Sequence, residues 1–199
     1  MRGVASRDET QGREHRVDPT LVERAMQGDE DAYGGLMVVV GDRMLAIAYR
    51  ILRDLHLADD AVQTALISAW RDLPTLRDPD RFEPWVMRLL VRACYAEAER
   101  RRRWSDQIRA LPLDGPALPD PTTSVADRDE LERGFRRLPI DQRAVFILHH
   151  YLGWSQAEIA ENLDLPLGTV KSRLYYATQT LRATLEADAR AVTSTGQTA

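Results

Sequence analysis

The stretch LPLDGPALPDPTT, residues 111–123, constrains the fold of this chain more than any other feature. It holds four prolines and one glycine, and no helical or alternating apolar pattern continues through it. Because proline lacks a backbone N–H donor, neither a regular helix nor a central strand runs through such a segment. We therefore expect an acidic, flexible linker over residues 104–127, with a separate folded unit on each side of it.

Apolar residues on both sides of the linker recur with the period of an α-helix. Over residues 58–72, the positions i, i+3, i+4, i+7 and i+8 predict one buried helix face, made of Val62, Ala65, Leu66, Ala69 and Trp70. No alternating strand pattern appears anywhere. The fold class is predicted to be all-α, with two small helical domains at 18–103 and 128–188 and disordered tails at 1–17 and 189–199. Helices are expected at about 19–27, 30–53, 58–72, 84–103, 126–137, 141–152, 155–163 and 167–187.

Composition excludes several classes of protein. No window of about 18 apolar residues is present, so the sequence predicts no membrane insertion. The charged start of the chain lacks the apolar core of a secretory signal. A single cysteine, Cys94, rules out an internal disulfide framework and favours a reducing, cytoplasmic setting.

Charge is unevenly distributed although the chain as a whole carries −4. Residues 85–103 hold six arginines against two glutamates, a net +4, and residues 133–182 hold seven basic against four acidic side chains, a net +3. The segment 104–127 between them carries −3. Two basic blocks separated by an acidic connector favour contact with nucleic acid at two places.

The second basic block contains a helix-turn-helix pattern. Ser155 and Glu158 have the spacing of a capping box, and the turn DLPLG, residues 164–168, precedes another helix. A recognition helix of this kind enters the major groove by its N-terminal end. The only lysine of the chain lies there, and the side chains left on or beside the outer face are Thr169, Lys171, Ser172, Arg173 and Tyr176.

This segment resembles region 4 of bacterial sigma factors. The match consists of GTVKSR at the start of the recognition helix and of Leu138, Pro139, Arg143, Val145 and Leu148 before it. The DNA-binding domains of LuxR-type regulators share part of this pattern, but Ser172 and Arg173 favour the sigma version. The resemblance implies that the helix reads the minus-35 promoter element.

The helix at 58–72 carries a second constellation. A carboxylate, an amide and an apolar residue occupy its outer face, which suits a partner helix: Asp60, Gln63, Thr64 and Ile67. The sequence DDAVQTAL resembles region 2.2 of sigma factors of the extracytoplasmic-function (ECF) type, although Thr64 replaces the usual acid. The resemblance implies docking on the β′ clamp coiled coil of core RNA polymerase, with region 4 on the β flap.

The segment after this helix resembles regions 2.3 and 2.4, which capture and melt the minus-10 element. Arg92 and Ala96 stand where the family has an Asn-x-x-x-Asp pair. The base specificity of that pair is therefore not carried over to these two positions. Unstacked bases need aromatic side chains on which to stack, and the DNA backbone beside them needs cationic side chains to bind its phosphates. The resemblance implies minus-10 contacts from Phe82, Trp85, Arg88, Arg92, Arg100, Arg101, Arg102 and Arg103.

The resemblance as a whole implies a sigma factor with promoter DNA and core polymerase as partners, possible control by an anti-sigma factor, and no cofactor. Two other readings stay open: a stand-alone helix-turn-helix regulator, and a sigma-like protein that sequesters polymerase or an anti-sigma factor. An enzyme is not expected, because Cys94 lies among apolar neighbours and His149 and His150 point about 100° apart on a helix. No metal site is expected.

Overall fold

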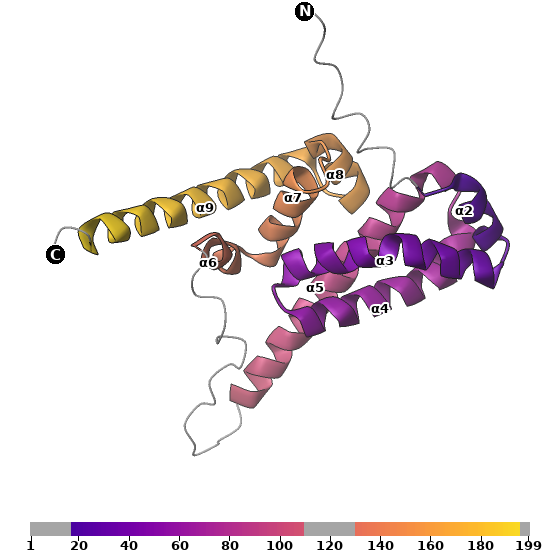
Figure 1. The fold of residues 1–199 in the computed structure, drawn as a ribbon, viewed down its shortest axis with the longest axis horizontal. Helices are drawn as coiled ribbons and strands as arrows, with labels where there is room; N and C mark the ends of the chain where they lie inside the picture. Colours follow the sequence, from indigo (N-terminus) through magenta and orange to yellow (C-terminus); the bar gives the residue numbers. More distant parts are fainter. Residues whose placement is uncertain (1–16, 110–129, 196–199) are drawn as a thin grey trace, which may run out of the picture.

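The computed structural model describes residues 17–109 and 130–195. Within these ranges every regular element is helical and none is a strand, which confirms the all-α prediction for this part of the chain. The predicted linker falls mostly on residues 110–127, outside the described ranges. Figure 1 shows α3 and α4 side by side, α5 crossing behind them, and the C-terminal helices above.

The N-terminal half consists of α2 (Pro19–Met26), α3 (Glu30–Leu52), α4 (Leu55–Asp72), the short 3-10 turns η1 (Leu73–Thr75) and η2 (Pro79–Arg81), and α5 (Phe82–Arg109). An aspartate begins each of the first three helices, and its carboxylate accepts backbone N–H bonds that the first turn leaves unpaired. These aspartates are Asp18, Asp29 and Asp54.

The C-terminal half consists of α6 (Glu130–Arg137), α7 (Ile140–His150), α8 (Gln156–Leu163) and α9 (Leu167–Thr195). Ser155 and Glu158 form the predicted capping box at the start of α8. The helix α6 lies so close to α9 that a Cβ on Gly134 would lie 2.9 Å from a methyl of Leu181. Glycine at position 134 therefore permits this close approach.

The two halves pack against each other along a contact that we call the seam, formed by α3 and α5 on one side and α6, α7 and α8 on the other. One apolar cluster runs through it, with Ile51 and Val91 in one half and Val145 and Ile159 in the other. Polar contacts across the seam include Arg53–Glu132, Arg81–Glu161, Asn162 to the Pro84 carbonyl, Arg143 to the Ile51 carbonyl, and Arg50 over the Tyr151 ring.

Several helix bounds differ from the expected ones. The helix α5 continues past 103 to Arg109, into the segment expected to be linker, and α9 continues past 188 to Thr195, into the expected tail. The continuation of α5 holds only two large apolar residues, Trp104 and Ile108, and that of α9 only Val192, too few to establish a helical period in the sequence. Val17, assigned to the N-terminal tail, is buried, and its N–H donates to Glu83 at 3.1 Å.

Two predictions about individual side chains are wrong. Trp70, expected on the buried face of its helix, is 40% exposed. Phe82 was assigned to DNA contact but is 1% exposed and belongs to the core. The Phe82 ring is part of the apolar core cluster, where burial removes its large apolar surface from water.

Candidate functional site

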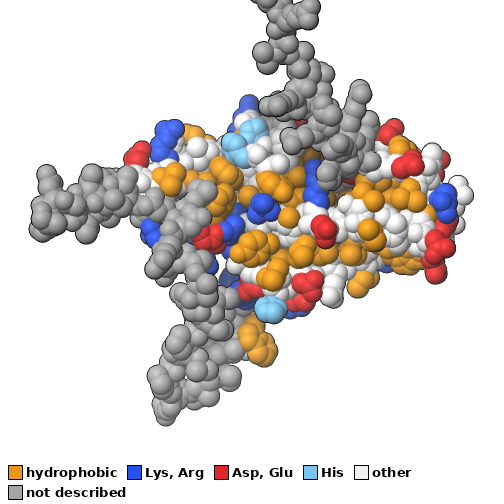
Figure 2. Space-filling view, in the orientation of Figure 1, with side chains coloured by type: hydrophobic (Ala, Val, Ile, Leu, Met, Phe, Trp, Pro, Cys, Tyr) orange, Lys and Arg blue, Asp and Glu red, His pale blue; other side chains and the backbone are white. Residues whose placement is uncertain are grey.

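The outer face of α4 carries the side chains predicted to contact polymerase. All four of them are exposed: Asp60, Gln63, Thr64 and Ile67. Ile67 is 70% exposed, an unusual position for a large aliphatic side chain. The opposite face holds Ala58, Ala61 and Ala65 against the core, so small side chains fix α4 close to its neighbours. A rigid helix thus presents a mixed apolar and polar stripe, and Figure 2 shows hydrophobic side chains interspersed with polar ones over the face of α3 and α4.

Trp70 extends this stripe by one turn. Its ring packs edge-on against Tyr33, with centroids 4.7 Å apart, and the Tyr33 hydroxyl donates to the Leu66 carbonyl at 2.6 Å. Burial raises the pKa of Tyr33 to about 12. In an ideal helix Trp70 points about 80° away from Val62, at the edge of the apolar face. That edge position is the signal in the sequence that could have placed Trp70 on the stripe.

A pocket of about 220 Å³ lies where η2 and the first turns of α5 meet α8. Trp85 and Arg88 line it from α5, and both are half-buried. Phe82 lies beneath Trp85, with ring centroids 6.0 Å apart. The predicted minus-10 side chains Trp85 and Arg88 are thus brought together around a concave site, whereas Phe82 supports the site from below.

The arginine run at the end of α5 is largely neutralised by neighbouring carboxylates. Arg100 pairs with Glu97, Arg102 and Arg103 share Glu99, and Arg101 pairs with Asp54 at 2.8 Å. The hydrogen bond from Arg102, followed by that from Arg103, lowers the pKa of Glu99 to about 2. A phosphate would therefore compete with these carboxylates for the guanidiniums, of which Arg100, Arg102 and Arg103 remain largely exposed.

The start of α9 presents the predicted minus-35 side chains unequally. Lys171 and Ser172 are exposed, and Tyr176 is 57% exposed, whereas Thr169 is half-buried. Arg173 donates to Asp141 of α7 at 3.0 Å, and its side chain is only 24% exposed. Tyr175, which sequence reasoning omitted, is 59% exposed beside Tyr176. Lys171 is the exposed cation at this helix start.

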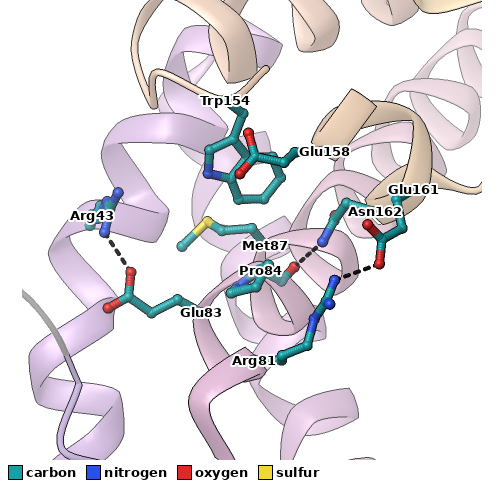
Figure 3. Close-up of a pocket in the computed structure, with 9 residues that line it drawn as sticks. All are labelled: Arg43, Arg81, Glu83, Pro84, Met87, Trp154, Glu158, Glu161 and Asn162. Carbon is teal, nitrogen blue, oxygen red and sulfur yellow. Dashed lines mark hydrogen bonds and ion pairs between the residues drawn. The ribbon is translucent and has the colours of Figure 1, made fainter. Parts of the chain in front are cut away.

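A second pocket of about 450 Å³ lies along the seam (Figure 3). Trp154 and Met87 face it from opposite halves, and Arg43 pairs with Glu83 at 3.0 Å on one side. Glu161 and Asn162 line both this pocket and the one beside Trp85. The sequence analysis did not identify Glu161 and Asn162 as site residues. Polar residues on the outer face of a short helix give no signal that another domain packs against that face.

The described residues offer no group of three or more metal-ligating side chains, and no described helix is long and apolar enough to cross a membrane. Burial raises the pKa of the Cys94 thiol to about 12, which disfavours the nucleophilic thiolate. His149 makes a 2.7 Å hydrogen-bond contact with the Trp154 carbonyl and thereby holds the turn before α8.

Comparison with protein families gives two matches in order along the chain. Residues 38–104 match the model of Sigma-70 region 2, and residues 128–181 match the model of Sigma-70, region 4. The first match covers α4 and most of α3 and α5, and the second covers α6 to the middle of α9. Together the matches span more than half of the chain.

Curated relatives are similar over nearly their full length. The ECF RNA polymerase sigma factor SigL of Mycobacterium tuberculosis is 31% identical over 169 residues, covering 81% of this chain and 95% of the relative. The ECF RNA polymerase sigma-E factor of Escherichia coli is 31% identical over 180 residues, covering 84% and 94%.

Two solved structures resemble the fold. CnrH, in complex with the cytosolic domain of CnrY, aligns with a TM-score of 0.60 at 27% identity and covers 86% of this chain and 98% of that one. The sigma factor RpoE in complex with the anti-sigma factor NepR, from Bartonella quintana, aligns with a TM-score of 0.61 at 22% identity, covering 78% and 98%.

Proposed function

The chain belongs to the ECF group of the sigma-70 family of RNA polymerase sigma factors, and we propose which of its surfaces carry out promoter-directed initiation. In this proposal α4 binds core polymerase, the loop and first turns of α5 engage the minus-10 element, and α9 reads the minus-35 element. The observation that carries it is the presence of three separate surfaces on one helical frame. Those on α4 and α5 lie within the region 2 match, and that at the start of α9 lies within the region 4 match.

The α4 stripe is the proposed polymerase contact. Asp60 and Gln63 offer an acceptor and an amide to a partner helix, and Ile67 and Trp70 offer apolar area beside them. Aromatic and aliphatic side chains surrounded by polar ones are typical of the centre of a protein interface. The partner would be the β′ clamp coiled coil, with region 4 on the β flap.

The DNA contacts follow from the two other surfaces. Trp85 and Arg88 line a pocket of about 220 Å³ that suits an unstacked base of the minus-10 strand, and Arg92, four positions further along α5, is exposed. Lys171 and Ser172 would approach the major groove, with Thr169, Arg173 and Tyr176 beside them. The run Arg100 to Arg103 would contact phosphates in competition with its carboxylate partners.

The proposal includes an anti-sigma factor as a further partner, the class named for the RpoE complex. It places the protein in the bacterial cytoplasm, at the nucleoid when bound to polymerase. No cofactor is required, because polymerase supplies the chemistry of RNA synthesis.

In vitro transcription tests the proposal. Sigma-free core polymerase from a related bacterium is supplied with the protein and a pool of genomic promoter fragments, and discrete new transcripts are expected. Asp60→Ala and the double variant Lys171→Ala/Arg173→Ala should abolish them, whereas Asp31→Ala, an exposed aspartate on α3, should not. Binding to core without any transcript, or DNA binding without core, would contradict the proposal.

A further inference from the structure

The pocket beside Trp85 contains a buried hydrogen-bond donor that no described residue satisfies. Arg88 lines this pocket of about 220 Å³, and its Nε is buried without a hydrogen-bond partner among the described residues. Buried donors in folded proteins are nearly always paired, and an unpaired one disfavours the folded state. An acceptor on a bound molecule would pair the Nε–H of Arg88.

The acceptors that line the same pocket do not serve Arg88. Asp78 accepts the backbone N–H two positions further along the chain at 3.0 Å, and Glu161 accepts from Arg81 at 2.6 Å. The Oδ1 atom of Asn162 is also buried without a partner, so it does not pair with Arg88. Arg88 is therefore the donor that a ligand in this pocket can address.

The lining of the pocket is rich in donors. Arg77, Arg81 and Arg88 contribute three guanidiniums, and the carboxylates that line the pocket with them are those of Asp78 and Glu161. A guanidinium offers five N–H donors and no acceptor. This lining favours a ligand whose edge carries acceptors and disfavours one whose edge carries amino groups, because donors that face donors stay unpaired.

The shape of a guanidinium also sets how far apart the acceptors of its ligand should lie. Its Nε–H and one Nη–H point the same way, side by side, so the group binds two neighbouring acceptors at once. Guanine presents such a pair at O6 and N7, and an unpaired cytosine presents one at O2 and N3. Adenine has an amino donor next to N7, and thymine has an N–H between its two carbonyls. Guanine and cytosine are therefore the bases that match Arg88.

Trp85 supplies a surface for the plane of the base. Its indole ring lines the same pocket and is half-buried, with the Phe82 ring behind it at a centroid distance of 6.0 Å. Stacking on an aromatic ring suits every base, so it adds affinity without selecting among bases. Arg88 follows Trp85 by three positions on α5, a spacing that makes the two side chains neighbours on the helix surface.

We propose that Arg88 selects the base that stacks on Trp85, and that the pocket takes guanine or cytosine in preference to adenine or thymine. The two parallel N–H donors of Arg88 bind O6 and N7 of guanine, or O2 and N3 of cytosine. The proposal rests on the proposed function for the identity of the pocket as part of the minus-10 site.

Selection from random DNA tests the proposal with the full-length chain bound to core polymerase. The pool consists of duplexes of random sequence that each contain a random unpaired stretch, and the retained DNA is sequenced. At one position of the unpaired stretch, guanine or cytosine should be enriched over adenine and thymine by at least about fivefold. Where guanine is selected, its replacement by 7-deazaguanine, which lacks N7, should weaken binding, whereas selection of cytosine would assign the O2 and N3 edge.

The variant Arg88→Lys keeps the charge but removes the pair of parallel donors. It should lose the preference at this one position and keep the preferences at other positions, whereas a purely structural role would lower the retention of all sequences together. Arg137→Lys makes the same change at an exposed position at the end of α6 and should select DNA as the wild type does. Both variants should melt near the wild-type temperature, because Arg88 Nε has no partner among the described residues to lose.

An enrichment profile of Arg88→Lys identical to that of the wild type would overturn the proposal. A preference for adenine or thymine that disappears in Arg88→Lys would overturn it too. Failure of the proposed function has a different signature, because the wild-type complex would then retain no sequence above the random background and this proposal would fall with it.

Discussion

Arg143 of α7 donates a hydrogen bond from Nη1 to the carbonyl oxygen of Ile51 in the last turn of α3, at 2.6 Å. Its Nη2 donates to the Leu138 carbonyl at 2.8 Å. The side chain is almost fully buried, and burial, followed by the nearby charge of Arg53, lowers its pKa to about 10. One guanidinium thus joins the C-terminal end of a helix in one half to the turn before α7 in the other.

Arg143→Met should destabilise the protein. It leaves two buried carbonyl oxygens without their donor, at a cost of about 1–3 kcal/mol in the free energy of unfolding. Urea unfolding followed by circular dichroism measures the loss. Arg137→Ala, an exposed arginine at the end of α6, is the control and should change the stability little. Equal effects of the two substitutions would contradict the role assigned to Arg143.

Ser155→Ala should remove the N-cap of α8 and lower the free energy of unfolding by about 1 kcal/mol at neutral pH. Ser105→Ala, inside α5, provides the control because alanine is the better helix former there. Thermal unfolding compares the two variants. A wild-type-like melting temperature for Ser155→Ala would show that the capping box is not needed to hold α8.

The same capping box should make stability depend on pH. The backbone N–H of Ser155, followed by its side chain, lowers the pKa of Glu158 below its ordinary value of 4.5. Since the folded pKa is the lower one, this stabilisation is present above about pH 4.5 and is lost as the pH falls through the folded value. Glu158→Gln should reduce the dependence of stability on pH below about pH 4.5, measured as urea unfolding midpoints between neutral and acidic pH. An unchanged dependence on pH would contradict the contribution assigned to Glu158.

Ile67→Glu should weaken binding to core polymerase by roughly tenfold or more, because it places a charge in the apolar part of the α4 stripe. Its melting temperature should stay near that of the wild type, since the side chain is 70% exposed. Val38→Glu, at an 81% exposed position on α3, is the matched control and should keep its affinity. Fluorescence anisotropy with labelled protein measures both, and equal losses would place the contact elsewhere.

Lys171→Ala should weaken binding of the polymerase complex to a promoter and reduce the slope of log affinity against log salt by about one. The physical reason is that one fewer counterion is released when one phosphate contact is lost. Arg182→Ala, about three turns further along α9, removes the same charge far from the helix start and should have a smaller effect. An unchanged salt slope in Lys171→Ala would exclude a phosphate contact by this lysine.

Cys94 should react slowly with maleimide in the native protein and quickly in urea. Its side chain is fully buried, and burial raises the pKa of its thiol to about 12. Mass spectrometry follows the labelling, with His56→Cys as an exposed control on α4 that should be labelled at once. Rapid native labelling of both cysteines would mean that α5 is not held in the core as described.

Local patterns in the sequence were enough for the helices and their caps. The apolar period placed α4 and α9, the capping box of Ser155 and Glu158 marked a helix start, and the outward direction of Ile67 followed from counting positions on a helix. These features depend on residues within a few turns of one another, where the geometry of the helix fixes which side chains share a face.

Tertiary structure decided what each exposed face meets. The sequence could not show that Phe82 turns into the core, that the arginine run finds carboxylates, or that Arg173 pairs with Asp141. Nor could it show that Glu161 reaches Arg81, eighty positions away along the chain. Polar side chains on a helix surface have no periodic signature of their partners, because those partners are set by how whole helices pack and not by spacing along one of them.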